Sequence, residues 1–307
     1  MPPDSLIDTL SQQIVNGLTL GSIYALIALG YTLVYGILLM INFAHSEIFM
    51  AGAFFALGAF ALPGVNRLSP LLQVALAMAS AMGGSALLAY SVEKAAYKPL
   101  RHASRLSPLI SAIGVSIFLQ NFFFLFVGSQ SLSFPELLPV KRLRLGGCEI
   151  DSLQVFILAI SLVIMAALKT FIQKTRLGKA LRATAGDRDA AELLGINTNA
   201  IISMTFLIGG ALGGAAGLLN GMYYGSVKYN MGFLPGIKAF TAAVLGGIGN
   251  VTGAVLGGLL IGLLESLGAG FIPGGSEWKD IFAFAVLILV LLFRPQGLLG
   301  EKTPEKI

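Results

Sequence analysis

The chain has 307 residues, of which 56% are hydrophobic and 11% are charged, and its mean hydropathy is +0.83. This composition predicts a polytopic membrane protein and excludes a soluble domain, while continuous apolar runs such as Phe282–Phe293 favour helices over a transmembrane β-barrel. The net charge of +5 comes mainly from basic loop residues, so retention of positive loops in the cytoplasm explains it and no nucleic-acid partner is needed.

Apolar segments account for most of the chain, with room for about eight or nine crossings at roughly 20 residues each. We therefore expect residues 1–307 to form one all-α helical membrane domain. The amino terminus carries Asp4 and Asp8 but neither a basic n-region nor a small-residue cleavage site. This predicts an uncleaved first span that starts outside the cytoplasm. In chain order the apolar segments are Ile14–Ile37, Ile48–Leu62, Leu71–Tyr90, Pro108–Val127, Leu153–Phe171, Ile201–Gly225, Gly236–Gly270 and Ile281–Phe293.

A polar turn separates the first two apolar segments. It places a histidine, a hydroxyl and a carboxylate in a row, and such groups are costly in hydrocarbon. One interpretation is a helix-capping turn at the membrane boundary, and the other is a translocation path or gate. The sequence leaves both open. The candidate path residues of this turn are Asn42, His45, Ser46 and Glu47.

Basic loops give the orientation of the chain, because short loops rich in Lys and Arg stay in the cytoplasm. The loop Ser91–Ser107, the loop Gln173–Asn199 and the carboxyl-terminal tail are all predicted to be cytoplasmic. Their basic residues are Lys94, Lys98, Arg101 and Arg105; Lys174, Arg176, Lys179, Arg182 and Arg188; and Arg294, Lys302 and Lys306.

The loop Gln173–Asn199 contains a short amphipathic stretch. From Asp187 to Leu194 charged residues are interspersed with alanine and leucine, so a helix there would have an apolar side but would be too short to span a membrane. It is either a docking helix that needs a partner or a solvated linker that folds back on the protein. The candidate docking residues are Asp187, Arg188, Ala191, Leu193, Leu194 and Gly195.

The segment Gly236–Gly270 is too long for one ordinary span. Both turns that flank it, Ser226–Pro235 and Ile272–Lys279, should lie outside, so the segment must leave and return to the same side. Glycine and asparagine accept turn conformations, and non-helical backbone at membrane depth must be buried or line a wet cavity. We therefore predict a break or re-entrant turn at residues 246–250. Its candidate gate residues are Gly246, Gly247, Gly249 and Asn250.

Glycines recur every four residues in two apolar segments, which places each set along one helix face. Small faces allow close helix packing, either within the bundle or against a second subunit, and sliding during gating is the alternative. The packing candidates are Gly209, Gly213, Gly217 and Gly221 in one segment, and Gly253 and Gly257 in the other.

The sequence lacks the motifs of disulfide-linked, metal-binding and catalytic proteins. Cys148 is the single cysteine, so there is no disulfide framework, and two histidines provide no plausible metal set. Neither H-E-x-x-H nor G-x-S-x-G occurs, which disfavours an intramembrane enzyme. The phosphate-binding pattern G-x-x-x-x-G-K-[ST] is also missing, since Gly178 and Lys179 are followed by alanine. We expect the chain not to hydrolyse ATP.

Five segments together closely resemble the LivH-type permease subunits of branched-chain amino-acid ABC importers. The resemblance covers nearly the whole chain, and the ordered set of five is specific to this permease group. The sequence departs from the family pattern at Ser46, where relatives commonly have glycine, and at Gly186, where many have an acidic residue. The segments are Gly21–Ile37, Ile41–Ala53, Ser111–Asn121, Leu193–Ile201 and Lys238–Ala254.

This resemblance implies a multi-subunit importer in the bacterial inner membrane. The expected partners are a related LivM-like second permease, two ATPase subunits that bind ATP and Mg, and a periplasmic amino-acid-binding protein. Asp187–Gly195 would be a coupling helix seated in the ATPase, with Ala191, Leu193 and Leu194 as anchors. The substrates would be leucine, isoleucine and valine. The alternatives are a urea or amide permease on the same scaffold, and a proton-coupled carrier that uses His45 and Glu47 as a relay.

Overall fold

The long apolar runs form helices because a backbone inside a membrane must satisfy its own hydrogen bonds. The computed structural model describes residues 3–101, 103–104, 106–139, 141–145, 148–272 and 274–300. The main helices are α1 (Pro3–Leu38), α2 (His45–Phe60), α3 (Pro70–Val92), α4 (Leu106–Val127), α5 (Ser152–Lys174), α8 (Thr198–Tyr224), α9 (Phe233–Gly246), α10 (Val251–Phe271) and α11 (Gly275–Phe293). Shorter pieces are η1 (Val65–Arg67), the π-helical turn η2 (Glu93–Tyr97), the 3-10 turn η3 (Lys98–Leu100), α6 (Arg176–Gly186) and α7 (Arg188–Leu193).

The predicted all-helical membrane bundle is confirmed. Within the described residues, α1, α3, α4, α5, α8 and α10 are long and apolar enough to cross a membrane, while α2 and α9 are apolar but shorter. The break expected in the segment Gly236–Gly270 is present, because α9 ends at Gly246 and α10 begins at Val251. The turn Ser226–Pro235 was expected to lie outside, but α9 already begins at Phe233, and its N-cap Gly232 packs on Ser46 of α2 inside the bundle.

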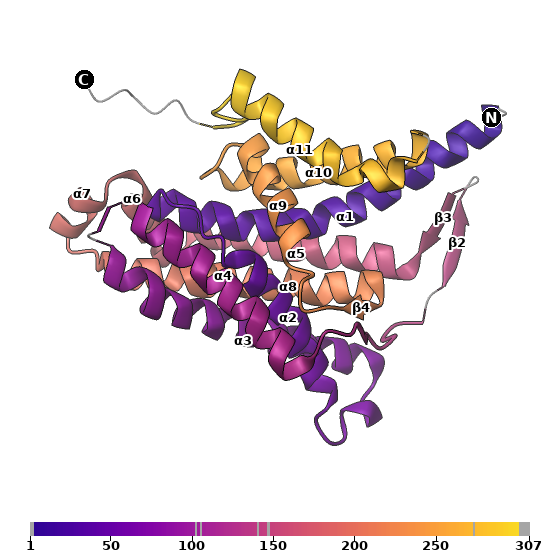
Figure 1. Cartoon of the computed structure of the whole chain (residues 1–307), viewed down its shortest axis with the longest axis horizontal. Coiled ribbons are helices and arrows are strands. Elements are labelled where there is room, and N and C mark those ends of the chain that lie inside the picture. Colours follow the sequence, from indigo (N-terminus) through magenta and orange to yellow (C-terminus); the bar gives the residue numbers. More distant parts are fainter. Residues whose placement is uncertain are drawn as a thin grey trace.

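The two ends of the bundle differ in charge. Figure 1 shows α6 and α7 at one end of the long axis, and the amino-terminal end of α1 with the β2–β3 hairpin at the other. Arg101 donates to Asn199 at the start of α8, which brings the loop after α3 to the α6–α7 end. Because the basic loops meet there, this end is assigned to the cytoplasm. Arg105, Lys302 and Lys306 lie outside the described residues.

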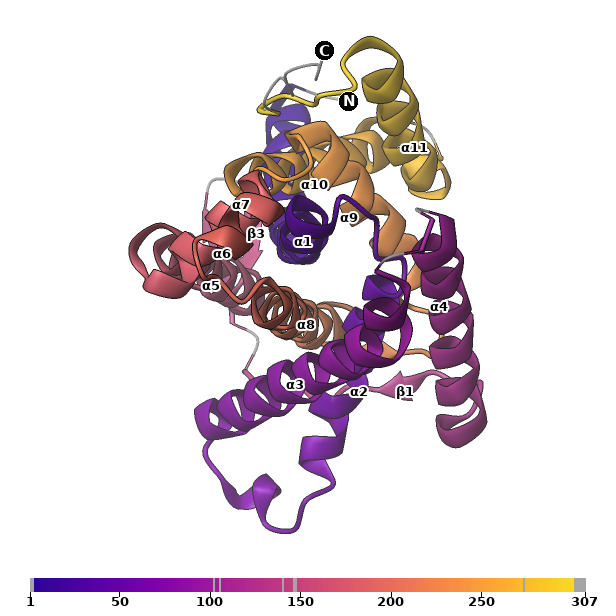
Figure 2. The same cartoon turned by 90° about the vertical axis from the view of Figure 1, so that its left-hand side faces the viewer.

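Helices α1 and α8 form the centre of the bundle. In the most apolar stretch of α1 89% of the residues are buried, and in that of α8 72%, whereas the values for α3 and α4 are 22% and 17%. Seen from the cytoplasmic end, α1 and α8 lie inside, while α3, α4, α5 and α11 lie toward the periphery (Figure 2). The exposed apolar faces of α3 and α4 are therefore available to lipid or to other subunits.

Most glycines of the two ladders lie where helices pack too closely for a side chain. A Cβ added at Gly217 of α8 would lie 2.2 Å from the carbonyl oxygen of Phe49 in α2. A Cβ at Gly257 of α10 would lie 1.9 Å from the carbonyl oxygen of Ala242 in α9. Close neighbours also surround the remaining candidates: Gly209 faces Gly30, Gly213 faces His45, Gly221 faces Phe134, and Gly253 faces Gly246. These contacts are all within the chain.

Short strands, which the sequence did not reveal, close the outer end. Strand β1 (Leu132–Ser133) pairs antiparallel with β4 (Ser226–Val227), and β2 (Arg142–Leu145) pairs antiparallel with β3 (Cys148–Asp151). Cys148 lies in β3, where its side chain is buried and its thiol lies 3.5 Å from the side-chain oxygen of Gln12 in α1. The strands lie in the connections from α4 to α5 and from α8 to α9.

Candidate functional site

The polar turn predicted at residues 42–47 begins the half-length helix α2. Helix α1 ends at Leu38, and Leu39 has a φ of +53°, a left-handed conformation that turns the chain back toward the bundle. Helix α2 then starts at His45 and has only 16 residues. Its N-cap, Ala44, provides no side-chain cap, and the Ser46 hydroxyl donates to the carbonyl of Phe43 at 2.9 Å.

The turn lies deep in the bundle. Glu47 accepts from Ser116 at 3.3 Å, and Gly213 packs against the His45 ring. Ser116 and Gly213 are both near the middle of their helices, Leu106–Val127 and Thr198–Tyr224. The side chains of Asn42, His45, Ser46 and Glu47 are all buried. A capping turn at the membrane boundary does not fit this position.

A second half-length helix meets the turn end to end. Gly232, the N-cap of α9, and Gly236 in its first turn both pack on Ser46 of α2. Because the first backbone N–H groups of a helix have no intrahelical partner, two such ends create a region of positive potential inside the membrane. Interrupted helices with this arrangement mark substrate sites in secondary transporters.

Three polar atoms of the turn lack hydrogen-bond partners among the described atoms. The Tyr97 hydroxyl donates to Oδ1 of Asn42 at 2.7 Å, but Nδ2 of Asn42, Nε2 of His45 and Oε2 of Glu47 have no partner. The His45 ring packs edge-on against Tyr31, with centroids 4.9 Å apart. A buried carboxylate with a free oxygen is costly, so a mobile cationic or hydrogen-bonding group is a suitable transient partner.

The glycine break at residues 246–250 lies away from the polar turn, at the cytoplasmic end. Asn250 caps α10 by accepting from the Gly253 amide at 3.0 Å, and its amide donates to Leu299 at 2.9 Å. The backbone of Leu298 donates to Leu245 at 2.7 Å. The structure therefore joins Gly246, Gly247 and Asn250 to the described part of the carboxyl-terminal segment, while Gly249 lies beside Gly36 near the end of α1.

A narrow apolar pocket lies between the two candidate gate regions. Its lining extends from Tyr31, which touches His45, to Ile248 in the glycine break. It is lined by Tyr31, Tyr35, Ile41, Phe240, Ala243 and Ile248. In this structure the crevice is too narrow for a water molecule, so its walls are in contact across most of its length.

A buried ion network was missed by sequence reasoning. Lys238 of α9 lies 2.8 Å from Glu265 of α10 and 2.6 Å from Asp280 of α11, and the Tyr24 hydroxyl of α1 donates to Glu265 at 2.9 Å. Lys238 and Glu265 are each 3% exposed. The available signal was a lysine and a glutamate inside apolar segments, which is rare without a structural or functional reason.

The short amphipathic helix predicted after Asp187 is present as α7, at the end of the bundle where the basic loops meet. Asp187 caps it by accepting from the Ala190 amide at 3.0 Å, and Gly195 ends it with a φ of +84°. Leu193 and Leu194 are 89% and 81% exposed. Ala191 is buried within the chain, so it is not available as an anchor for a partner. Arg188 lies 3.5 Å from Glu192 on the polar side.

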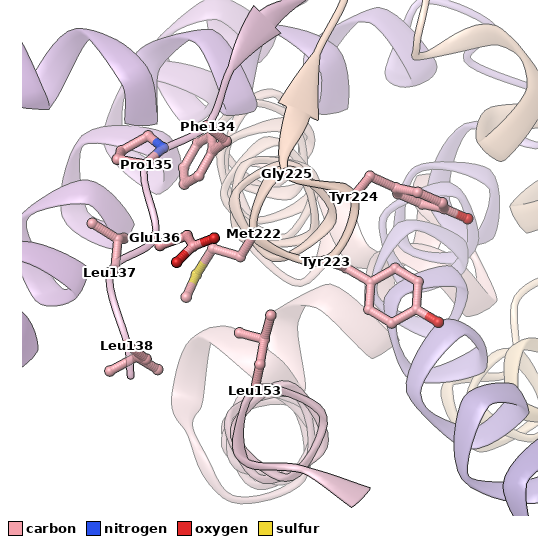
Figure 3. A pocket seen from close by; sticks show the side chains of 10 residues that line it. All are labelled: Phe134, Pro135, Glu136, Leu137, Leu138, Leu153, Met222, Tyr223, Tyr224 and Gly225. Atoms are coloured by element: carbon pink, nitrogen blue, oxygen red, sulfur yellow. The ribbon is translucent and has the colours of Figure 1, made fainter. Parts of the chain in front are cut away.

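A separate cavity of about 260 Å³ opens at the outer end. Figure 3 shows the Glu136 carboxylate beside Met222 and Leu153 within it, while Tyr223 and Tyr224 point away. The described residues contain no group of three or more His, Cys, Asp and Glu side chains that would hold a metal ion.

Comparisons with known proteins extend over almost the whole chain. Residues 13–291 match the family described as branched-chain amino acid transport system / permease component. The high-affinity branched-chain amino acid transport system permease protein BraD of Pseudomonas aeruginosa is 51% identical over 303 residues, covering 96% of this chain and 97% of that protein. The corresponding LivH protein of Escherichia coli K12 is 45% identical, with the same coverage of both chains.

More distant similarities were also found. The probable branched-chain amino acid transport permease protein LivH of Methanocaldococcus jannaschii is 29% identical over 294 residues, covering 91% of this chain and 89% of that protein. A solved structure, PsaBC from Streptococcus pneumoniae in complex with Fab, has a TM-score of 0.42 and 16% identity, covering 95% of this chain and 92% of that chain. The last similarity is too low to carry an argument.

Proposed function

The chain belongs to the permease family of branched-chain amino acid transport systems, and we propose that it is the membrane subunit of an ATP-driven importer for leucine, isoleucine and valine. Full-length similarity to relatives described as permease proteins of high-affinity branched-chain amino acid transport systems carries the proposal. The chain is a multi-pass transport subunit and not itself an ATPase. The system to which it belongs must therefore contain further subunits.

The further subunits in this proposal are a second, related permease, two ATPase subunits that bind ATP and Mg, and a periplasmic binding protein. The complex would lie in the bacterial inner membrane. Helix α7 supports the ATPase contact, because two adjacent leucines, Leu193 and Leu194, are more than four-fifths exposed on a charged cytoplasmic loop. Such leucines gain free energy when a partner buries them. We assign them as the anchors of the coupling helix.

The translocation path in this proposal passes the polar turn of α2. The amino acid is a zwitterion with an apolar side chain, so it needs transient polar partners and apolar walls. Glu47 has a free carboxylate oxygen for the ammonium group, and the facing helix ends of α2 and α9 favour the carboxylate. The apolar crevice between Tyr31 and Ile248 leads toward the cytoplasm and would have to widen for the side chain to pass.

The test is reconstitution of the complete complex in proteoliposomes with and without each partner. Uptake of radiolabelled leucine should require ATP, the ATPase subunits and the binding protein. Uptake by this chain alone, driven by a proton gradient, would overturn the proposal in favour of a secondary carrier. Uptake of urea but not leucine by the complete complex would overturn the substrate assignment and leave the ATP-driven mechanism intact.

A further inference from the structure

The π-helical turn η2 continues α3 into the cytoplasmic loop and points two side chains inward. Glu93 and Tyr97 lie four residues apart and are 0% and 1% exposed, while Lys94 of the same turn and Lys98, which follows it, are exposed. Residues at this spacing share a helix face, and π turns recur at functional sites. The face of this turn that carries Glu93 and Tyr97 therefore contacts the interior of the protein.

Glu93 connects this turn to the start of α8. Its carboxylate pairs with Arg101 and accepts from the Ser203 hydroxyl at 2.9 Å, and the same Arg101 donates to Asn199. The ion pair is almost fully buried, with side-chain exposures of 4% for Arg101 and 0% for Glu93. Separating a buried pair is unfavourable, so α3 and α8 are held together at this point.

Tyr97 connects the same turn to the polar turn of α2. Its hydroxyl donates to Oδ1 of Asn42 at 2.7 Å, and its ring packs against Phe206 of α8 at a centroid distance of 5.2 Å. Asn42 is 2% exposed, three residues before His45. A displacement of η2 therefore acts directly on the segment that leads into α2.

The docking helix contacts the other end of this network. Glu192 of α7 accepts from the Thr198 hydroxyl, and Thr198 directly precedes Asn199, the partner of Arg101. Three hydrogen bonds and one ion pair thus form a series from α7 to Asn42, which is completed by the backbone between Thr198 and Asn199 and by the turn η2 between Glu93 and Tyr97. Each link joins two different elements, so relative movement of the elements must stretch or break a named bond.

We propose that Glu93 and Tyr97 are positioning residues that transmit movement of the docking helix to the polar turn of α2. The inference rests on the proposed function, since it requires that α7 bind the ATPase and that the turn line the path. The turn η2 is attached to α8 by the buried ion pair of Glu93 and to the polar turn by the single hydrogen bond of Tyr97. The Tyr97 hydrogen bond is therefore the contact that can be removed with least damage to the fold.

The experiment compares Tyr97→Phe with wild type in the reconstituted complex, measuring ATP hydrolysed per leucine imported. Tyr97→Phe keeps the ring on Phe206 and removes only the hydroxyl. We expect normal assembly and ATP hydrolysis but about fivefold less leucine imported per ATP, the factor corresponding to about 1 kcal/mol for one buried hydrogen bond. Tyr90→Phe in α3 is the matched control, because its ring lies beside the exposed Lys94, and it should keep the wild-type ratio.

Ser203→Ala removes the second partner of Glu93 and provides an independent variant if Tyr97→Phe fails to assemble. The double variant should lose little more coupling than the stronger single variant, because both act on one series of contacts. A wild-type ratio in assembled Tyr97→Phe, or strictly additive effects, would overturn the relay. A wild-type complex that does not import leucine would instead overturn the proposed function, so the two failures are distinguishable.

Discussion

Lys238 of α9 and Glu265 of α10 form an ion pair of 2.8 Å that is buried inside the helical bundle. The pair joins the half-length helix to the full-length helix that follows the glycine break. Asp280 and Tyr24 complete the network from α11 and α1, so four helices converge on one lysine and one glutamate. This network holds α9 against α1, α10 and α11 through side-chain contacts, which the hydrogen bonds within the helix cannot do.

The first prediction concerns this pair. Glu265→Ala should destabilise the protein by about 3–5 kcal/mol, because removal of one partner leaves a buried charge without full compensation. Thermal unfolding in detergent, followed by loss of the monodisperse peak, measures the change. Glu277→Ala in the exposed first turn of α11 is the control. Equal stability of Glu265→Ala and Glu277→Ala would show that the network is not structural.

The second prediction concerns ATPase docking. Leu194→Asp should release the ATPase subunits or uncouple hydrolysis from transport, because a well-packed leucine at an interface contributes about 1.5–3 kcal/mol. Co-purification with the ATPase and substrate-stimulated ATP hydrolysis are the measurements. Leu143→Asp in the β2 strand makes the same change at an exposed position of the outer end and should keep both. Wild-type behaviour of Leu194→Asp would exclude α7 as the docking helix.

The third prediction concerns the path. Glu47→Gln should reduce uptake per assembled complex by about 10-fold to 100-fold, since hydrogen bonds to a charged group contribute about 1.5–3 kcal/mol. The glutamine has nearly the same shape as the glutamate that it replaces, so the variant loses only the negative charge. Uptake is measured at equal amounts of folded complex, with Glu277→Gln as control. Loss of folded protein with unchanged uptake per complex would point to a structural role at the start of α2.

The fourth prediction concerns the glycine contacts. Gly217→Ala should destabilise the bundle by about 1–3 kcal/mol, because the added methyl group would overlap the Phe49 carbonyl and force α8 away from α2. Gly114→Ala in α4 is the matched control, since no atom lies within 4 Å of its added Cβ. The midpoint of thermal unfolding distinguishes them. An equal midpoint for both variants would contradict the close-packing interpretation.

The sequence predicted features that depend on local chemistry. Hydrophobic length predicted the spans, and the glycines and Asn250 predicted the break between α9 and α10. The alternation of charge and leucine after Asp187 predicted a short amphipathic helix. Each of these features depends only on residues close together in the sequence, so it could be predicted without the tertiary structure.

Features that join distant parts of the chain were not predictable in the same way. Ser46 meets Gly232 and Gly236 only because two half-length helices begin at the same depth. The partner of Lys238 lies 27 residues further on, at Glu265. Ala191 was expected on the docking surface but faces inward, because a short amphipathic helix does not reveal which apolar residue its own protein covers.

The concealment of Cys148 simplifies spectroscopic work on this chain. The sequence contains no other cysteine, and this one is 4% exposed, at the end of the molecule remote from α7. A thiol introduced at Leu193 would therefore be far more reactive toward maleimide probes than the native one, without a cysteine-free background having to be made first. A spin label at that position would report directly on whether α7 becomes immobilised when ATP binds to the proposed ATPase subunits.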